Sequence, residues 1–140
     1  MLTSDVPRVA AWVAEKVGAP KNDAQSAIGW TRDDEITCGV FYEHFTGASI
    51  TATIAIAPGA VMPKDFLWAI FDYPFNQLNC EKIVALVAEN NYRSVHLLGR
   101  MGFIREASIS DYYPAGEAMI IYTLTRQDCR FLGEPNGTTQ

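Results

Sequence analysis

Asn91 and Ser94 are three residues apart, just after a strongly apolar segment, where side chains often take part in chemistry. Six of the seven residues of Lys82–Ala88 are apolar, which predicts a buried strand. The residues after Asn91 have helical spacing, and Gly102 is a natural helix end. An amide and a hydroxyl at a helix start can cap the helix, or they can hydrogen-bond to a bound molecule and transfer a proton to it. The sequence leaves both readings open.

A second candidate site is the loop Pro58–Lys64, which is rich in glycine and proline. It leads into a segment with helical spacing, so it would place backbone N–H groups at a helix start, where phosphates bind. Gly59 permits close approach of the backbone, and Lys64 adds a positive charge. A plain turn with a solvated lysine is the alternative. Arg93 and Arg100 are seven apart and share one helix face, where they meet either phosphates or solvent.

A proton acceptor is best sought in the segment Phe41–Phe45, which reads FYEHF near the end of a predicted strand. Its two ionisable residues, Glu43 and His44, point to opposite faces of a sheet because side chains alternate along a strand. At most one of them can therefore serve a given site. We favour Glu43 as a general base, although either side chain could simply be solvated.

The composition excludes several classes of function. The chain of 140 residues carries a net charge of −5, without the basic surface that non-specific nucleic-acid binding needs. Three cysteines without paired spacing and two histidines in unrelated segments predict neither a disulfide framework nor a metal site. No segment approaches the roughly 18 apolar residues of a membrane span, and the N-terminus lacks a signal-peptide pattern. We expect a cytoplasmic protein with no nucleic acid, membrane or metal partner.

The apolar periodicity predicts the element order α, βββ, α, β, α, ββ. A helix over Asp5–Val17 has its valines on one face and ends at Gly18. A meander of three antiparallel strands follows, at 27–31, 36–45 and 49–57. The C-terminal part adds a helix at 92–101, strands at 103–108 and 118–125 around a turn, and a short helical turn at 126–132. Residues 1–132 are expected to form one domain and 133–140 a disordered tail.

A helix predicted over about 65–79 contains Pro74, which removes a hydrogen bond at a cost of ~3 kcal/mol and predicts a break near Asp72–Tyr73. The strand Lys82–Ala88 is apolar at nearly every position, so we expect both of its faces to be covered. It should lie parallel to the strand at 49–57, joined to it by a right-handed βαβ crossover.

The helix predicted at 92–101 and its flanking segments resemble the GNAT superfamily of acyl-CoA-dependent N-acyltransferases. The resemblance is strongest to its ribosomal-protein alanine acetyltransferase-like branch and to small bacterial and phage members. The resemblance covers about residues 49 to 132. It rests on an aromatic-rich crossover helix and on two motifs, Asn91-x-x-Ser94-x-x-Leu97-Leu98-x-x-Met101-Gly102-Phe103-x-x-Glu106 and Tyr122-Thr123-Leu124-Thr125-Arg126. It implies an α+β (α/β) fold with a mixed, mostly antiparallel sheet, a central βαβ crossover and splayed parallel strands.

The resemblance also implies a function, the transfer of an acetyl group from acetyl-CoA to a primary amine on a peptide N-terminus or a small molecule, by direct attack. It assigns coenzyme contacts to the main chain of one strand, to the loop before the crossover helix and to the second helix, namely Ile54, Ala55, Ile56, Gly59, Met62, Lys64, Asn91, Arg93, Ser94 and Arg100. Ser94 would also protonate the leaving thiolate. The acceptor pocket would be formed by the N-terminal helix, the segment 18–26 and the turn 109–117, with Tyr112, Tyr113 and Glu106 as further candidates.

Two departures from the superfamily favour an alternative. The span Pro58–Lys64 lacks the usual Gln/Arg-x-x-Gly-x-Gly/Ala diphosphate loop, and Leu98 occupies the place of a tyrosine that protonates the thiolate in many members. The ribosomal-protein branch also tends to lack that tyrosine. The alternative is a catalytically weak or inactive protein of this fold that binds acyl-CoA or a protein partner. A homodimer is expected from the resemblance.

Overall fold

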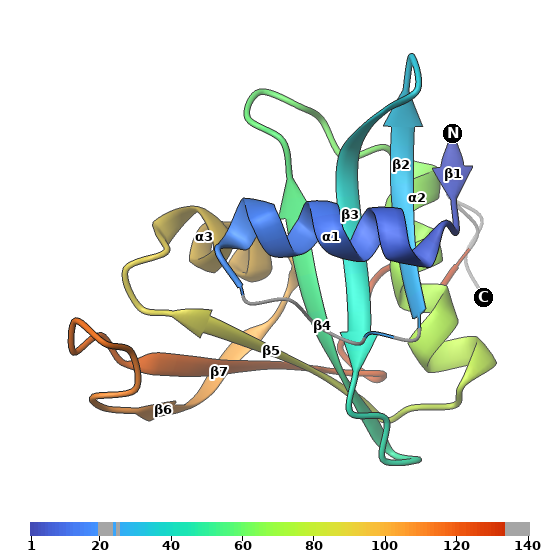
Figure 1. Cartoon of the computed structure of the whole chain (residues 1–140). Helices are drawn as coiled ribbons and strands as arrows, with labels where there is room; N and C mark the ends of the chain where they lie inside the picture. The colour runs from blue at the N-terminus through green and yellow to red at the C-terminus, as the bar shows by residue number, and fades with distance from the viewer. Residues whose placement is uncertain (20–23, 25, 134–140) are drawn as a thin grey trace.

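A computed structural model describes residues 1–19, 24 and 26–133 of the chain (Figure 1). Residues 20–23 and 25 of the segment 18–26, which is expected at the acceptor pocket, and most of the tail predicted at 133–140 therefore lie outside the described residues. The described part is one mixed sheet with three helices and one π-helical turn packed on its two faces. This is the predicted α+β architecture.

The sheet has seven strands in the order β1-β2-β3-β4-β5-β7-β6. All neighbouring pairs are antiparallel except β4 and β5, which are parallel. The strands are β1 (Leu2–Thr3), β2 (Ser26–Arg32), β3 (Glu35–Glu43), β4 (Ser49–Ile56), β5 (Lys82–Ala88), β6 (Ile104–Ile109) and β7 (Met119–Thr125). The helices are α1 (Val6–Val17), α2 (Lys64–Asp72) and α3 (Tyr92–Met101), and a π-helical turn η1 (Tyr73–Gln77) continues α2.

Helix α1 crosses the sheet over β2, β3 and β4 (Figure 1). The Asp5 carboxylate caps it by accepting from the N–H of Arg8 at 3.3 Å, and Gly18 ends it in the left-handed conformation. Its buried valines rest on two strand glycines, because a Cβ at Gly29 or Gly39 would lie 2.8 Å from a valine methyl group. The missing side chains let the helix backbone approach the sheet closely.

Helix α2 lies on the opposite face and breaks where Pro74 predicts a break. Pro74 has no N–H for the carbonyl of Ile70, and the Tyr42 hydroxyl of β3 donates to that buried carbonyl instead, at 2.6 Å. The chain widens into the π-helical turn, in which the N–H of Leu78 bonds to the carbonyl of Tyr73. A buried tyrosine thus replaces the hydrogen bond that the proline removes.

The prediction that β5 is covered on both faces is wrong. Ile83, Ala85 and Val87 are buried against α2 and α3, whereas Leu86 is 43% exposed. The physical reason is that α1 covers β2 to β4, and no described helix covers the other half of the same face (Figure 1).

The strands differ from prediction in two further ways. The strand predicted to reach Phe45 ends at Glu43, because His44 takes a positive φ of 56° that interrupts the extended chain. A short strand at Leu2–Thr3, absent from the prediction, pairs with β2. Two residues carry too little periodicity to be recognised in a sequence.

The close packing of α1 gives a stability prediction. Gly39→Ala should lower the free energy of unfolding by roughly 1–3 kcal/mol, because the new methyl group meets Val13 and Val9 at 2.8 and 3.2 Å. The control is Gly99→Ala in α3, where a Cβ meets nothing within 4 Å. It should raise stability by about 0.8–1 kcal/mol through helix propensity. Urea unfolding measures both, and equal effects of the two substitutions would contradict the packing argument.

Candidate active site

The site originates where β4 and β5 separate. These parallel strands pair through three residue pairs, Ser49 with Lys82, Ile50 with Ile83 and Thr51 with Val84. Beyond them β4 continues to Ile56 beside β3, while β5 continues to Ala88 beside β7. The two strands diverge, and a cleft runs between their C-terminal halves.

The register shows which backbone groups of β4 face the cleft. The N–H of Ala57 donates to the carbonyl of Thr37, which turns position 57 toward β3. Since backbone groups alternate along a strand, Ala55 also faces β3, while Ile54 and Ile56 turn their N–H and C=O groups toward the cleft. Two peptide groups of β4 are therefore available to a bound molecule.

The same reasoning applies to β5. The N–H of Arg126 donates to the carbonyl of Glu81 across the β5–β7 pair, so odd-numbered residues of β5 bond to β7. Leu86 and Ala88 consequently turn their backbone groups toward the cleft. The cleft is thus bordered by hydrogen-bonding groups from both strands.

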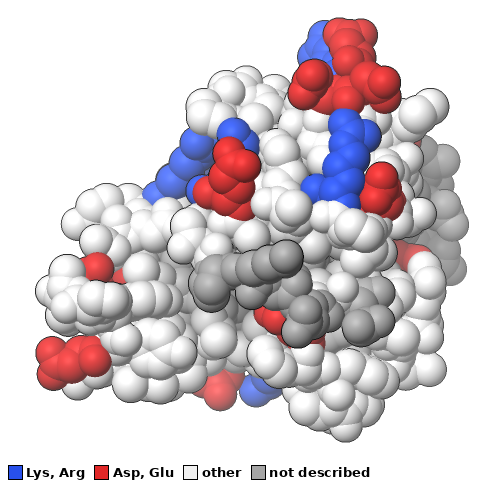
Figure 2. Space-filling view, in the orientation of Figure 1, with Lys and Arg blue, Asp and Glu red and all other residues white. Residues whose placement is uncertain are grey.

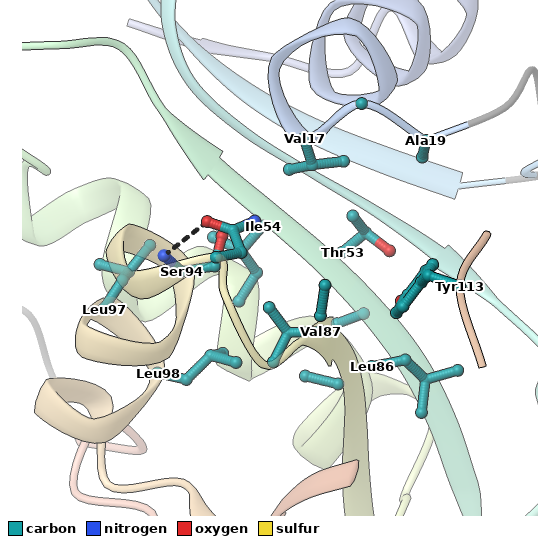
Figure 3. Close-up of a pocket in the computed structure, with 15 residues that line it drawn as sticks. Val17, Ala19, Thr53, Ile54, Leu86, Val87, Ser94, Leu97, Leu98 and Tyr113 are labelled. Atoms are coloured by element: carbon teal, nitrogen blue, oxygen red, sulfur yellow. Dashed lines mark hydrogen bonds between the residues drawn. The ribbon is translucent and has the colours of Figure 1, made fainter. Parts of the chain in front are cut away.

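Helix α3 begins at the mouth of this cleft. The Asn91 side chain caps it, with Oδ1 accepting from the N–H of Ser94 at 3.3 Å (Figure 3). That bond leaves the Asn91 amide N–H groups and the Ser94 hydroxyl at the cleft wall, where both residues line the cavity. Capping and ligand contact are therefore compatible, because they use different atoms.

The cleft has two connected arms. The apolar arm, about 210 Å³, is lined by Val17, Gly18, Ala19, Ala52, Thr53, Ile54, Ala85, Leu86, Val87, Ala88, Asn91, Ser94, Leu97, Leu98 and Tyr113 (Figure 3). The basic arm, about 180 Å³, is lined by Lys16, Val17, Ile54, Ala55, Ile56, Pro58, Asn91, Arg93, Ser94 and Leu97. Lys16 and Arg93 give the second arm its charge. The shared residues, which include Ile54 and Ser94, make the two arms one continuous groove.

Comparison with solved structures identifies the fold. The chain superimposes on a variant of the spermidine N-acetyltransferase SpeG from Vibrio cholerae with a TM-score of 0.72, 16% identity and coverage of 94% of this chain and 97% of that one. It superimposes on the ribosomal-protein-S5-alanine acetyltransferase from Vibrio fischeri with a TM-score of 0.59, 19% identity and coverage of 75% and 63%. It superimposes on the Campylobacter jejuni N-acetyltransferase PseH, in complex with acetyl coenzyme A, with a TM-score of 0.58, 15% identity and coverage of 75% of this chain and 70% of that one.

The chain has the GNAT fold. No family model and no curated protein matches the sequence. The chain spans 58 to 63% of the length of several of the matched acetyltransferases. What those whole proteins do is therefore carried over only as a proposal.

Within the GNAT fold, the structure brings together many of the residues predicted for the site. Ile54, Asn91 and Ser94 line both arms. The basic arm adds Ala55, Ile56 and Arg93. Segments predicted for the acceptor pocket also meet in the apolar arm, where Val17–Ala19 faces Tyr113.

Other predicted residues lie outside both arms. Gly59 is in a turn with φ 77°, and Met62 packs against the main core. Lys64 is exposed at the first residue of α2, whose N-cap Pro63 supplies no side-chain hydrogen bond. Arg100 lies at the far end of α3, where its carbonyl accepts from the Arg130 guanidinium. Arg93 and Arg100 are seven residues apart, so they share a helix face but lie ~10 Å from each other along the helix axis.

The two predicted carboxylates have different surroundings. Glu43 is the last residue of β3 and pairs with Thr51, on the face of the sheet that carries Thr53 of the apolar arm. It does not line either arm. Glu106 accepts from the Thr123 hydroxyl at 2.8 Å and from Lys82 at 3.1 Å, and these bonds hold its pKa below the usual range. Glu106 thus joins β5, β6 and β7 away from the cleft.

For two of the residues that line the site, the sequence gives little indication of that position. Lys16 belongs to α1, and its place in the basic arm depends on how that helix crosses the sheet. Tyr113 follows β6 in a turn held by bonds from two N–H groups to the Glu117 carbonyl. Burial raises the pKa of Tyr113, with smaller effects of Tyr112 and Glu117, so its hydroxyl stays protonated at neutral pH. In the sequence, the adjacent tyrosines Tyr112 and Tyr113 are the feature that points to this turn.

The described residues contain no cluster of three or more His, Cys, Asp and Glu side chains that could hold a metal ion. None of the helices among them is both long enough and apolar enough to span a membrane.

Proposed function

We propose that the protein is an N-acyltransferase that transfers an acetyl group from acetyl-CoA to a primary amine by direct attack. The observation that carries the proposal is the separation of β4 from β5 beside the start of α3. It leaves an amide-bordered groove of the kind that an extended, amide-containing chain such as pantetheine can join as an extra strand. The fold shared with known acetyltransferases supports the same function.

In this proposal the pantetheine lies along Ile54 to Ile56 in the basic arm. The Asn91 amide donates a hydrogen bond to it. Lys16 and Arg93 attract the phosphate groups, against the overall negative charge of the chain. The N–H groups at the start of α2, its first residue Lys64, and Gly59 and Met62 in the preceding loop supply the remaining diphosphate contacts.

The chemistry follows from groups at the junction of the two arms. A cleft-facing N–H of β4 stabilises negative charge on the thioester oxygen as the amine forms the new C–N bond. The C–S bond then breaks, and the Ser94 hydroxyl gives a proton to the departing thiolate, directly or through water, while it takes up a proton from solvent water and is regenerated. A thiol with a pKa of about 8.5 leaves readily, so a weak acid suffices. Glu43 accepts the amine proton through a water, because its side chain does not line the arm.

A second function remains supported by one observation. Among the described residues lining the apolar arm, Tyr113 is the single side chain that titrates, and Leu98 stands where many relatives have a tyrosine. A protein that binds acyl-CoA without turnover would need no acid or base there. A homodimer remains a prediction from the resemblance, and a cytoplasmic location remains a prediction from the composition. Sedimentation equilibrium would measure the first.

Acetyl-CoA tests the proposal directly. A saturating concentration, about 100 times Kd, should stabilise the protein by about 2.7 kcal/mol and raise its Tm by several degrees. Thiol release should follow when amines are added, and Ser94→Ala should lower kcat about 10-fold with little change in KM for acetyl-CoA. Arg93→Gln should weaken coenzyme binding roughly 2- to 5-fold, while Arg100→Gln on the same helix should not.

The two functions separate in this experiment. Stabilisation by acetyl-CoA without thiol release across a panel of amines would favour binding without turnover. No stabilisation at all would contradict both.

Asn91 allows capping to be separated from coenzyme binding. Asn91→Ala removes the cap and should lower the free energy of unfolding by about 1 kcal/mol, whereas Asn91→Asp keeps a capping oxygen and should preserve stability. Both variants lack the amide N–H donors, so both should raise the KM for acetyl-CoA. An unchanged KM in Asn91→Asp would mean that Asn91 only caps the helix.

Glu43 is tested against a glutamate at the other end of the same strand. Glu43→Gln should lower kcat by about 100-fold near neutral pH, with the loss shrinking as the pH approaches the pKa of the amine, where the free amine no longer needs a base. Glu35→Gln, an exposed residue at the start of β3, should have no such effect. Matching pH–rate profiles for the two variants would remove Glu43 from the mechanism.

A further inference from the structure

We infer that the acceptor of this site is a small primary amine with an apolar, ring-sized body, such as an arylalkylamine, and not a polyamine. The inference rests on the proposed function and concerns the apolar arm, where the amine must lie if the coenzyme occupies the basic arm. Three observations carry it: the chemistry of the lining, the size of the arm and the side chains at its open end.

The residues that line the two arms differ in charge. Lys16 and Arg93 line the basic arm, whereas the described residues that line the apolar arm include no Asp, Glu, Lys, Arg or His. A polyamine carries further ammonium groups, and burying such a charge without a carboxylate partner is strongly unfavourable. A body of carbon atoms, in contrast, gains free energy when it leaves water here.

The size of the apolar arm suits one compact group. Its volume is about 210 Å³. An engineered apolar cavity of about 150 Å³ in another protein holds a benzene molecule. The arm can therefore take the reacting end of the thioester and a ring-sized body, but not a long chain.

The open end of the arm is apolar and aromatic. Leu86 of β5 and Tyr113 of the β6–β7 turn both line it, on the side away from α3 (Figure 3). Leu86 is 43% exposed although it is a leucine. Around it, acidic and basic side chains are sparse on the surface over β5 and β7, while they gather near α1 and the β2–β3 turn (Figure 2). An aromatic body would cover Leu86 and pack against the Tyr113 ring.

The experiment compares three amines, phenethylamine, ethylamine and spermidine, in the acetyl-CoA thiol-release assay with the whole protein. Phenethylamine should have a kcat/KM at least about 10-fold above each of the others, the range in which apolar pockets discriminate. Leu86→Asp places a carboxylate at the arm and should reduce the phenethylamine-to-spermidine ratio at least about 10-fold. Tyr113→Ala should reduce the phenethylamine-to-ethylamine ratio.

The matched control is Ile104→Asp. Ile104 is also an exposed apolar residue, at 60%, and its register with Thr123 places it on the same face of the sheet as Leu86, but it does not line the arm. This substitution should leave all ratios unchanged. A preference for spermidine in the unmodified protein, or an equal effect of Leu86→Asp and Ile104→Asp, would overturn the inference.

The experiment also separates this inference from the proposed function. If acetyl-CoA binds but none of the three amines releases thiol, the proposed function fails. Saturation-transfer NMR on the acetyl-CoA-loaded protein then still tests the arm. A phenethylamine signal that Leu86→Asp abolishes would support an arm for apolar amines, and a spermidine signal of equal strength, or no signal from either amine, would overturn it.

Discussion

The short pairing of β4 with β5 is the constraint on which the rest of the structure depends. Three residue pairs join the two halves of the sheet, and past Thr51 each strand keeps a single partner. Backbone N–H and C=O groups need partners, and those of Ile54, Ile56, Leu86 and Ala88 have no neighbouring strand within the described sheet to supply them. Water or a ligand must do so. The cleft is therefore a consequence of topology, and the side chains around it determine which ligand it accepts.

Hydrogen bonds from both halves of the sheet to the crossover segment keep the halves together despite the cleft. The crossover from β4 to β5 passes through the break at Pro74, where carbonyls lose their helical partners. Tyr42, from β3 in the first half, donates to Ile70, and Arg126, just after β7 in the second half, donates to Phe75 and Cys80. Each half of the sheet thus donates to carbonyls of the same crossover segment between β4 and β5. A proline that weakens the helix locally becomes the point where the halves are joined.

Local features of the structure could be predicted from the sequence, and features set by distant contacts could not. The bounds of β5 and α3 follow from apolar runs and from Asn91 and Gly102, and the structure has them at 82–88 and 92–101. The cleft lining of Asn91 and Ser94 follows from their place at a helix start. The exposure of Leu86 could not be predicted, because it depends on where α1 lies on the sheet. Lys16 of the basic arm depends on that same packing.

The chemistry of the apolar arm also bears on how an amine could react there. If the proposed function holds, an ammonium ion would lose hydration in this arm, whose described lining residues carry no charge. The arm would then lower the pKa of a bound amine and favour the neutral form that attacks the thioester. In this proposal desolvation would remove part of the need for a general base, and Glu43, acting through water, would accept the remaining proton. In this proposal the positive charges of Lys16 and Arg93 in the basic arm would also repel a second ammonium ion near the junction of the arms. Under the proposed function, one charge distribution would bind the phosphates, activate the amine and reject polycations.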